Sequence, residues 1–340
     1  MLKDLDGIAC LGDPRHYDCD QYVEAVYSRN EKLLSSVGNI LDNGKSCRIL
    51  QEIIQTGIGE NVDVRVGIVT TGSDGRKEKK GDHTSPLEVV VLVKRSLAIE
   101  RISDELRVQC LSIINDLGIF GGLIEIKDLD LDKVAYCQDY FPPSPWPTIV
   151  IDFFPLGNAN GELVNLSREL LFKEVVSSGG KLIVESVKKR LKEYRQVTRT
   201  GQNSFKGNAV KHFDRESGEL FYDQSSAVKQ GSVKYGPLRT IQMFLANKIL
   251  QFMKEHSSDA DFIQKIPGQT EAKIAALLDS GALNLNDVEA KELTQLYKYF
   301  LWCFYLSEYS YSQNGKEKVV VVPDVQLFRE NIDNLLKLIY

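Results

Sequence analysis

Residues 64–93 read VRVGIVTTGSDGRKEKKGDHTSPLEVVVLV, and this stretch decides the fold. Residues 64–70 form a β-branched run that is followed by Gly72 and Gly75, and residues 87–93 form a second apolar run. Short apolar runs bounded by glycine are typical of buried β-strands. The sequence therefore predicts two strands joined through a glycine-containing turn.

The turn GSDGR, residues 72–76, has the chemistry of a phosphate-binding corner. Gly72 has no Cβ, so a phosphate group can approach the backbone closely, and Ser73 adds a hydroxyl to the backbone N–H donors. Arg76 supplies a guanidinium that forms charge-assisted hydrogen bonds with phosphate oxygens. The turn is therefore a candidate nucleotide-binding element.

The same stretch resembles the G-S-x-G-R-x-E…S-D-x-D/E signature of the DNA polymerase β-like nucleotidyltransferases. Within that superfamily it is most similar to bacterial proteins related to the amino-terminal part of protein-PII uridylyltransferase. The positions that match are Gly72, Ser73, Gly75, Arg76, Glu78, Ser85 and Glu88. The resemblance implies that Gly72, Ser73, Gly75 and Arg76 bind a nucleotide and that Glu88 is a catalytic metal ligand. Pro86 stands where the family has its first metal-binding carboxylate, so the carboxylate pair is incomplete.

Residues 123–126 are a short strand candidate, and a stronger strand is predicted at residues 148–154, TIVIDFF, which carries Asp152 in an otherwise apolar run. A carboxylate in a buried strand is costly unless it meets a cation or hydrogen-bond donors. Polymerase β-like enzymes carry their third carboxylate on a strand after the first hairpin, and the resemblance makes Asp152 the candidate for it. The equally weighted alternative is an aspartate that caps a strand end or pairs with a basic side chain.

Two further acidic segments are candidates for completing a metal site. Asp82 lies in an insertion before the second strand, beside His83, and is the acidic residue nearest upstream of Pro86. The expected metal set is therefore Glu88 and Asp152, which the resemblance implies, together with Asp82 as a replacement for the missing carboxylate, with Mg or Mn as the ion. Asp128, Asp130 and Asp132 alternate in KDLDLDKV and would face one side of an extended chain, for which a solvated sheet face is favoured over a metal cluster.

The organisation of the whole chain follows from its periodicity. The 340 residues suffice for two domains. Helical spacing predicts helices at residues 21–41 and 46–55 before the first strand, at 97–117 after the second, and over most of the chain from about 160 to 312. The expected fold class is α+β: a helical lead-in at 1–59, a polymerase β-like mixed sheet with helices at 60–160, and an all-helical bundle that binds substrate at 161–340.

A second resemblance lies at residues 233–239, VKYGPLR. It is similar to the D-L-K-x-G-G-L-R element that opens the helical carboxy-terminal part of the same bacterial proteins. The family's aspartate is Ser232 here, a second departure at an acidic position. The resemblance implies that Lys234 and Arg239 contribute to nucleotide binding.

Three segments of the carboxy-terminal half have alternative interpretations. Residues 213–223, FDRESGELFYD, predict a short hairpin, and the valines before Pro323 predict a strand or an extended arm. The helix at 181–197 is rich in lysine and arginine, which favours a solvated face over a docking surface for phosphate or an acidic partner. The aromatic residues at 296–311 could stack bases, but their helical spacing favours a core.

Composition restricts the class of protein. Forty-two basic and 47 acidic residues give a net charge of −5 without a global polyanion-binding signature, so nucleic acid is not favoured as a partner. No apolar run approaches the roughly 20 residues that span a bilayer, and the amino terminus has no signal-peptide layout, which indicates a cytoplasmic protein. The six cysteines form no C-x-x-C pair.

The expected function is nucleotidyl transfer, in which a protein or small-molecule hydroxyl attacks the α-phosphate of a metal-bound nucleoside triphosphate and pyrophosphate leaves. The alternative is a catalytically silent nucleotide-binding or regulatory protein with the same fold, because Pro86 replaces a metal carboxylate. An adaptor that uses only its helical part is a third hypothesis. The nucleotide, the acceptor and the oligomeric state stay open at this point.

Overall fold

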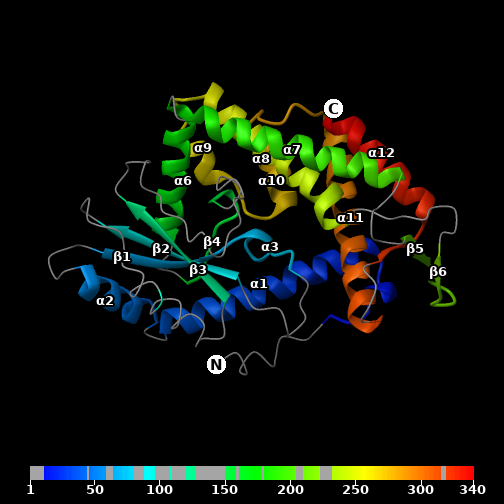
Figure 1. Ribbon diagram of the computed structural model, residues 1–340, viewed down its shortest axis with the longest axis horizontal. Coiled ribbons are helices and arrows are strands. Elements are labelled where there is room, and N and C mark those ends of the chain that lie inside the picture. Colours follow the sequence, from blue (N-terminus) through cyan, green and yellow to red (C-terminus); the bar gives the residue numbers. More distant parts are fainter. Residues whose placement is uncertain are drawn as a thin grey trace. The chain divides into compact units, whose positions relative to one another are not determined.

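The structure is a computed structural model that describes residues 11–43, 46–58, 64–79, 88–95, 108, 120–127, 150–157, 161–177, 180–203, 210–222, 232–314 and 319–340. It has a mixed α+β architecture (Figure 1), which confirms the expected class at that level. The chain forms two compact units, one built mainly from residues 27–183 and 253–269 and the other from 11–26, 184–252 and 270–340.

The two units interleave along the chain, whereas the sequence interpretation placed 1–59, 60–160 and 161–340 in succession. The reason is that three of the described helices each belong partly to one unit and partly to the other. They are α1 (Cys19–Asn43), α7 (Gly180–Asn203) and α8 (Arg239–Glu255). Local periodicity identifies a helix but does not say which compact unit each of its turns joins.

The first unit contains a mixed sheet whose described strands have the order β3–β2–β1–β4. Strands β1 (Val64–Thr70) and β2 (Glu88–Arg95) are antiparallel, and Thr70 lies opposite Val89. Strand β3 (Phe120–Lys127) runs parallel to β2, and the short β4 (Phe154–Pro155) pairs antiparallel with the end of β1. The hairpin predicted around the GSDGR turn is confirmed.

Burial explains why β1 and β2 read as continuous apolar runs. Ile68 and Val69 point to opposite faces of the sheet and both are buried, as are Val90 and Val91 on β2. Helix α2 (Ser46–Ile58) contacts β1, and α6 (Gly161–Val176) contacts β1 and β4. The helices predicted at 21–41 and 46–55 are confirmed as α1 and α2, while the helix predicted at 97–117 falls, except for Val108, outside the described residues.

The predicted strand at 148–154 is wrong for most of its described part. Val150 and Ile151 form a helical turn, Asp152 follows in a turn, and only Phe154 and Pro155 pair with β1. The backbone N–H of Phe153 donates to the carbonyl of Val150 at 3.2 Å, so this segment bends before it reaches the sheet. Apolar content predicted a strand, but the hydrogen bonds around Asp152 favour a turn.

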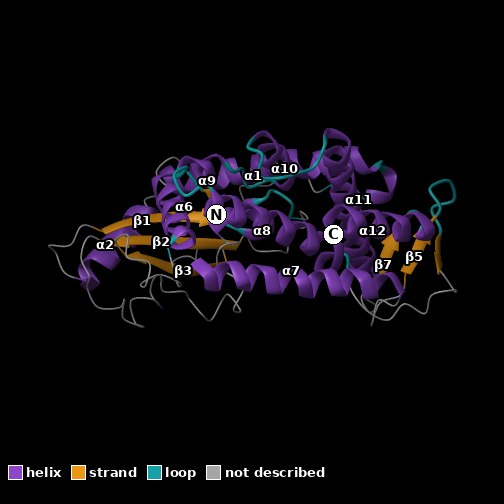
Figure 2. Cartoon of the chain, turned by 90° about the horizontal axis from the view of Figure 1, so that it is seen from above, coloured by secondary structure: helices purple, strands orange, loops and turns teal. Residues whose placement is uncertain are grey.

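The second unit is not all-helical, which corrects the sequence interpretation. Strands β6 (Leu220–Tyr222), β5 (Val210–Phe213) and β7 (Val320–Val322) form a sheet in that order, and β5 and β7 run side by side in Figure 2. The hairpin predicted at 213–223 exists as β5 and β6, and the valine run is a strand. The sheet was missed because the parallel pairing of β5 with β7 joins residues about one hundred positions apart.

The other described elements are helices and helical turns. In the second unit, helix α11 contacts α10, α12 and β7. The remaining elements are α3 (Gly72–Gly75), α9 (Asp261–Lys265), α10 (Thr270–Asp279), α11 (Asp287–Asn314), α12 (Val325–Ile339), the short turn η2 (Pro14–His16) and the π-helical turn η5 (Lys234–Leu238).

The aromatic segment at 296–311 contributes four buried rings to the core, as its helical spacing favoured, whereas Tyr311 is 42% exposed. Tyr297, Phe300, Trp302 and Tyr305 on α11 are almost fully buried. The ring of Tyr305 lies 5.7 Å from that of Tyr22 on α1. Among the described helices, none combines the length and apolar character that crossing a membrane requires.

Candidate functional site

The GSDGR turn starts with a backbone conformation that favours glycine. Gly72 has φ +60°, in the left-handed region, and begins the one-turn helix α3 directly after Thr71. The backbone N–H of Gly75 donates to the carbonyl of Thr71 at 3.1 Å, which closes the turn. Gly72 and Ser73 are half-buried, whereas Gly75 and Arg76 are buried. The corner of the turn therefore stays accessible while its far end lies in the protein interior.

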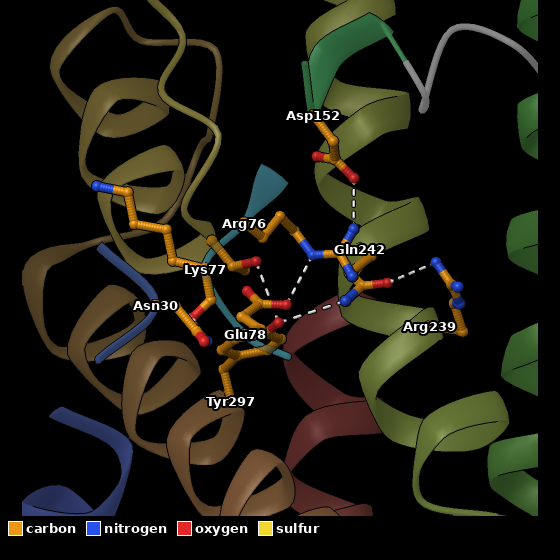
Figure 3. Close-up of polar contacts among 9 residues, drawn as sticks. Asn30, Arg76, Lys77, Glu78, Asp152, Arg239, Gln242 and Tyr297 are labelled. Carbon is orange, nitrogen blue, oxygen red and sulfur yellow. Dashed lines mark hydrogen bonds and ion pairs between the residues drawn. The ribbon is translucent and has the colours of Figure 1, made fainter. Parts of the chain in front are cut away.

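Arg76 lies between two carboxylates, as Figure 3 shows. Its Nε donates to Oε2 of Glu78 at 2.7 Å, and its Nη1 donates to Oδ2 of Asp152. The exposed fractions of the three side chains are 4%, 2% and 11% for Arg76, Glu78 and Asp152. We call these three residues the buried ion cluster. Asp152 thus pairs with a basic side chain, which was one of the two interpretations of its place in an apolar run.

Lys77, which directly follows Arg76 in the sequence, adopts a strained backbone conformation. Its φ of +61° makes it the one non-glycine residue with positive φ in the described ranges. Such a conformation costs free energy and persists only when neighbouring contacts enforce it. Nζ of Lys77 lies 3.1 Å from Oε1 of Glu31 and 5.2 Å from the ring centroid of Phe154.

Asn30 on α1 also contacts the backbone of this segment. Its Nδ2 donates to the carbonyls of Lys77 at 2.7 Å and of Lys79 at 2.9 Å, and its side chain is directed at this segment in Figure 3. Asn30 is buried, so these two hydrogen bonds are shielded from water. One side chain therefore fixes the chain on both sides of Glu78.

We expect Asn30→Ala to lower the free energy of unfolding by about 1–3 kcal/mol, because two partly buried carbonyls lose their donor. The midpoint of urea unfolding measures the effect. Asn165→Ala is the matched control, since Asn165 is exposed on α6 and its side chain makes no hydrogen bond among the described residues. Equal, small effects of both substitutions would show that Asn30 does not hold the turn.

An ion pair between Lys79 and Asp74 fixes the end of the segment 72–79. Nζ of Lys79 lies 2.9 Å from Oδ2 of Asp74, whose side chain is 3% exposed. This ion pair connects Lys79, the last described residue of the segment, to Asp74 in α3. The segment 72–79 is therefore held by Asn30, by the buried ion cluster and by its own Asp74–Lys79 pair.

Three backbone segments meet at Gly75 without room for side chains. A Cβ on Gly75 would lie 2.0 Å from the carbonyl oxygen of Asp152, and a Cβ on Gly268 would lie 2.8 Å from the carbonyl oxygen of Gly75. Real Cβ atoms do not approach backbone atoms this closely. The loop at Gly268, after α9, is thus a third side of the site, and the sequence interpretation missed it.

Arg168 on α6 holds the segment that carries Asp152. Its guanidinium donates to the carbonyls of Ile151 at 3.2 Å and Phe153 at 3.5 Å, and to that of Gln264 at 3.3 Å. Burial lowers the pKa of Arg168 to about 10, and the negative charge of Asp152 partly opposes that shift. Because the carbonyls on both sides of Asp152 accept from Arg168, they are not available to a strand ladder.

Sequence reasoning missed Asn30 and Arg168 as well. A signal for Arg168 existed, since it lies at helical spacing with Val164, Leu171 and Val175, which are buried on the same face of α6. A lone arginine in such an apolar stripe must find acceptors in the interior. No comparable signal marks Asn30, whose acceptors lie 47 and 49 residues later in the chain.

Two of the predicted carboxylate residues, Glu88 and Asp152, lie at the end of the sheet that carries the GSDGR turn. Glu88 is the first residue of β2, one position before the partner of Thr70, so its backbone lies at the same end of the sheet as the GSDGR turn. Phe154 also pairs with Thr70, which brings Asp152 to this end. The other acidic candidates and their neighbours lie outside the described residues: Asp82, His83, Ser85, Pro86, Asp128, Asp130 and Asp132.

Lys234 and Arg239 belong to the second unit and flank an irregular turn. Gly236 has φ −102° and ψ −107° inside η5, and Arg239 is the first residue of α8. Nη1 of Arg239 donates to Oε1 of Gln242 at 3.0 Å. Nζ of Lys234 lies 5.9 Å from the ring centroid of Tyr235 and 6.0 Å from that of Phe304.

The described part of the site does not fit a divalent metal ion. The carboxylate of Asp152 already has a cation, because Arg76 occupies one of its oxygens, and Glu78 binds the same guanidinium. A metal would have to displace a buried arginine whose charge both carboxylates need. Within the described ranges no group of three or more His, Cys, Asp or Glu side chains is placed to hold a metal.

Comparison with known proteins adds no family. A scan against models of protein families and a search among curated proteins both find no match for this chain.

Proposed function

We propose that the chain binds a nucleoside triphosphate at the sheet end formed by the GSDGR turn and that this site is silent in nucleotidyl transfer. One observation carries the proposal: Arg76 pairs with Asp152 in the buried ion cluster, while Gly72 and Ser73 stay half-buried at the corner of the turn. The accessible corner retains the donors that suit a phosphate, whereas the carboxylate that a transferase needs is already neutralised.

The corner of the turn offers a phosphate a close approach to the backbone and a hydroxyl donor. Gly72 permits close backbone approach through its positive φ, and Ser73 presents a hydroxyl beside it. Their positions are fixed by the contacts of the segment that follows, so little conformational entropy is lost on binding. Preorganisation of this kind favours a ligand with anionic oxygens.

The role proposed for Arg76 differs from the one that the resemblance implies. A guanidinium that is 4% exposed and bonded to two carboxylates has little remaining attraction for a phosphate. Its charge is more than balanced by Glu78 and Asp152. In this proposal Arg76 organises the turn, and the direct phosphate contacts come from Gly72 and Ser73.

A second candidate is active transfer of a nucleoside monophosphate from the triphosphate to a protein or small-molecule hydroxyl. The placement of the Glu88 backbone, the GSDGR turn and Asp152 at one end of the sheet favours it. Both candidates share nucleotide binding and differ only in chemistry. Asp152 would then have to exchange Arg76 for another cation during the reaction.

We expect a saturating nucleoside triphosphate to raise the melting temperature by about 5 °C at a hundredfold excess over Kd, because binding to the folded state alone adds about 2.7 kcal/mol. Ser73→Ala should weaken affinity about tenfold by removing one hydroxyl contact. Ser177→Ala, at the end of α6, is the matched control and should leave the shift unchanged. ATP, GTP, UTP and CTP are compared with and without Mg or Mn by differential scanning fluorimetry.

The chemistry is tested separately with α-³²P-labelled nucleotides and the full chain. Absence of label transfer to protein or small-molecule hydroxyls, together with a thermal shift, supports the silent site. Transfer that Glu88→Ala abolishes would establish the second candidate. No thermal shift with any nucleotide would overturn both and favour the adaptor hypothesis.

A further inference from the structure

The carboxylates around the GSDGR turn already have cations that the chain itself supplies. In the buried ion cluster, Arg76 binds both Glu78 and Asp152 (Figure 3). Nζ of Lys79 lies 2.9 Å from Oδ2 of Asp74. All three carboxylate residues are buried, and salt screens buried ion pairs much less than exposed ones. Each of these carboxylates is therefore compensated by a cation that belongs to the protein.

Arg168 on α6 provides a further cation beside Asp152. Its guanidinium donates to the carbonyls of Ile151 and Phe153, the residues on either side of Asp152. Burial lowers the pKa of Arg168 to about 10, and the negative charge of Asp152 partly opposes this shift. A group with that pKa stays protonated at neutral pH. Asp152 therefore interacts with two guanidinium groups, one in direct contact and one bonded to the neighbouring backbone.

The charges of these groups balance. The buried ion cluster, the Asp74–Lys79 pair and Arg168 together contain three cations and three carboxylates. Mg and similar hard cations bind ionised oxygens, and their affinity depends on the negative charge that those oxygens contribute. A divalent ion at Asp152 would add two positive charges to a balanced group, and the two guanidinium groups would repel it. The described side chains here thus supply the counter-charge that the resemblance assigns to a metal.

Phosphate oxygens can bind at the corner of the turn without a bridging ion. Gly72 and Ser73 are half-buried there, and the positive φ of Gly72 lets a ligand approach the backbone closely. Backbone N–H groups and a hydroxyl donate to phosphate oxygens directly. These donors contact the same oxygens in a free triphosphate as in its Mg complex. The affinity of the corner therefore does not depend on the ion.

We propose that a nucleoside triphosphate binds this corner without a divalent metal ion, because Arg76 and Arg168 serve as the counter-ions of Asp152. The inference rests on the nucleotide binding proposed above and adds the form of the ligand, the metal-free triphosphate. In a metal-dependent site the ion joins protein carboxylates to phosphate oxygens, so removing the ion releases the nucleotide. Here the nucleotide stays bound when the ion is removed.

Isothermal titration calorimetry of the full chain with ATP, GTP, UTP and CTP tests the inference. Each nucleotide is titrated in a Mg buffer and in an EDTA buffer of the same ionic strength, so that screening is equal in both. For a nucleotide that binds, the two Kd values should agree within about threefold. A Kd that is about tenfold or more weaker in EDTA would overturn the inference and leave nucleotide binding intact. The absence of heat in both buffers, together with the absence of a thermal shift, would instead overturn the proposed function on which the inference rests.

Asp152→Asn distinguishes a compensated carboxylate from a metal ligand by the sign of its effect. The variant keeps the shape of the side chain but leaves the two guanidinium groups with less negative charge beside them, so affinity in EDTA should rise about two- to fivefold. A loss of about tenfold or more in Mg, the result expected for a metal ligand, would overturn the inference. Asp261→Asn makes the same change in charge at an exposed residue of α9 and should leave both Kd values within about twofold.

The comparison of the two buffers uses the unaltered chain, so it decides the inference even if Asp152→Asn does not fold. Circular dichroism and the melting temperature check the fold of both variants. Glu88 is tested in the same two buffers. If binding requires Mg and Glu88→Gln removes that requirement, the ion belongs to Glu88 and the inference is wrong.

Discussion

Arg76→Ala is expected to lower the free energy of unfolding by about 3–5 kcal/mol, the largest effect of any single side-chain truncation proposed for this protein. The substitution removes the cation that Glu78 and Asp152 share. Two buried carboxylates would then lose the cation that they share, and less of the cost of desolvating them is offset. Urea unfolding followed by circular dichroism measures the loss.

The matched control is Arg65→Ala. Arg65 on β1 also pairs with a carboxylate, that of Glu162, but the two side chains are 49% and 66% exposed. Exposed pairs of this kind contribute about 0–1 kcal/mol, so the control should change the unfolding midpoint only slightly. If Arg76→Ala were as mild as Arg65→Ala, the buried ion cluster would not be a structural element.

A combined variant separates lost charge balance from lost packing. Arg76→Met, Glu78→Gln and Asp152→Asn together keep the approximate shapes but remove all three charges. Replacing a whole buried ion group by neutral residues is often close to neutral in stability, while breaking it is costly. The triple variant should therefore be more stable than Arg76→Ala alone.

Gly75→Ala is expected to cost more than about 4 kcal/mol or to prevent folding, because the added methyl group meets backbone rather than a flexible side chain. The new Cβ would lie 2.0 Å from the carbonyl oxygen of Asp152 and 3.2 Å from that of Thr70. Either β1 or the turn at Asp152 would have to move, and both are held by further contacts. Soluble yield and melting temperature report the result.

Gly161→Ala is the control for the glycine prediction. A Cβ on Gly161, the first residue of α6, would meet nothing within 4 Å. Alanine in a helix is favoured over glycine by roughly 0.5–1 kcal/mol, so this variant should be neutral or slightly more stable. A folded Gly75→Ala protein with an unchanged melting temperature would mean that the turn and the Asp152 segment are not in contact as described.

The alternation and length of apolar runs were sufficient to predict the hairpin of β1 and β2, the helices α1 and α2, and the aromatic core of α11. These features depend on neighbours in sequence: the apolar residues at 89–92 favour a strand wherever a sheet covers them, and helical spacing creates a buried face. The glycine turn between the strands was predictable for the same reason, since Gly72 adopts a conformation that other residues avoid.

Only the tertiary structure decided the environment of the site. Arg76 and Asp152 are 76 residues apart, and nothing in either segment says that they pair. The same holds for Arg168, whose bonds to the carbonyls of Ile151 and Phe153 accompany a turn where apolar content had predicted a strand.

The sheet of the second unit was also decided by the tertiary structure, because β5 and β7 pair although they lie about 110 residues apart in the sequence. Short-range patterns record the preference of a residue for a helix, strand or turn. A buried charge pairs with whichever donor or acceptor the folded chain brings within hydrogen-bond distance. Leaving that charge unpaired in the interior costs more free energy than any local conformational preference supplies.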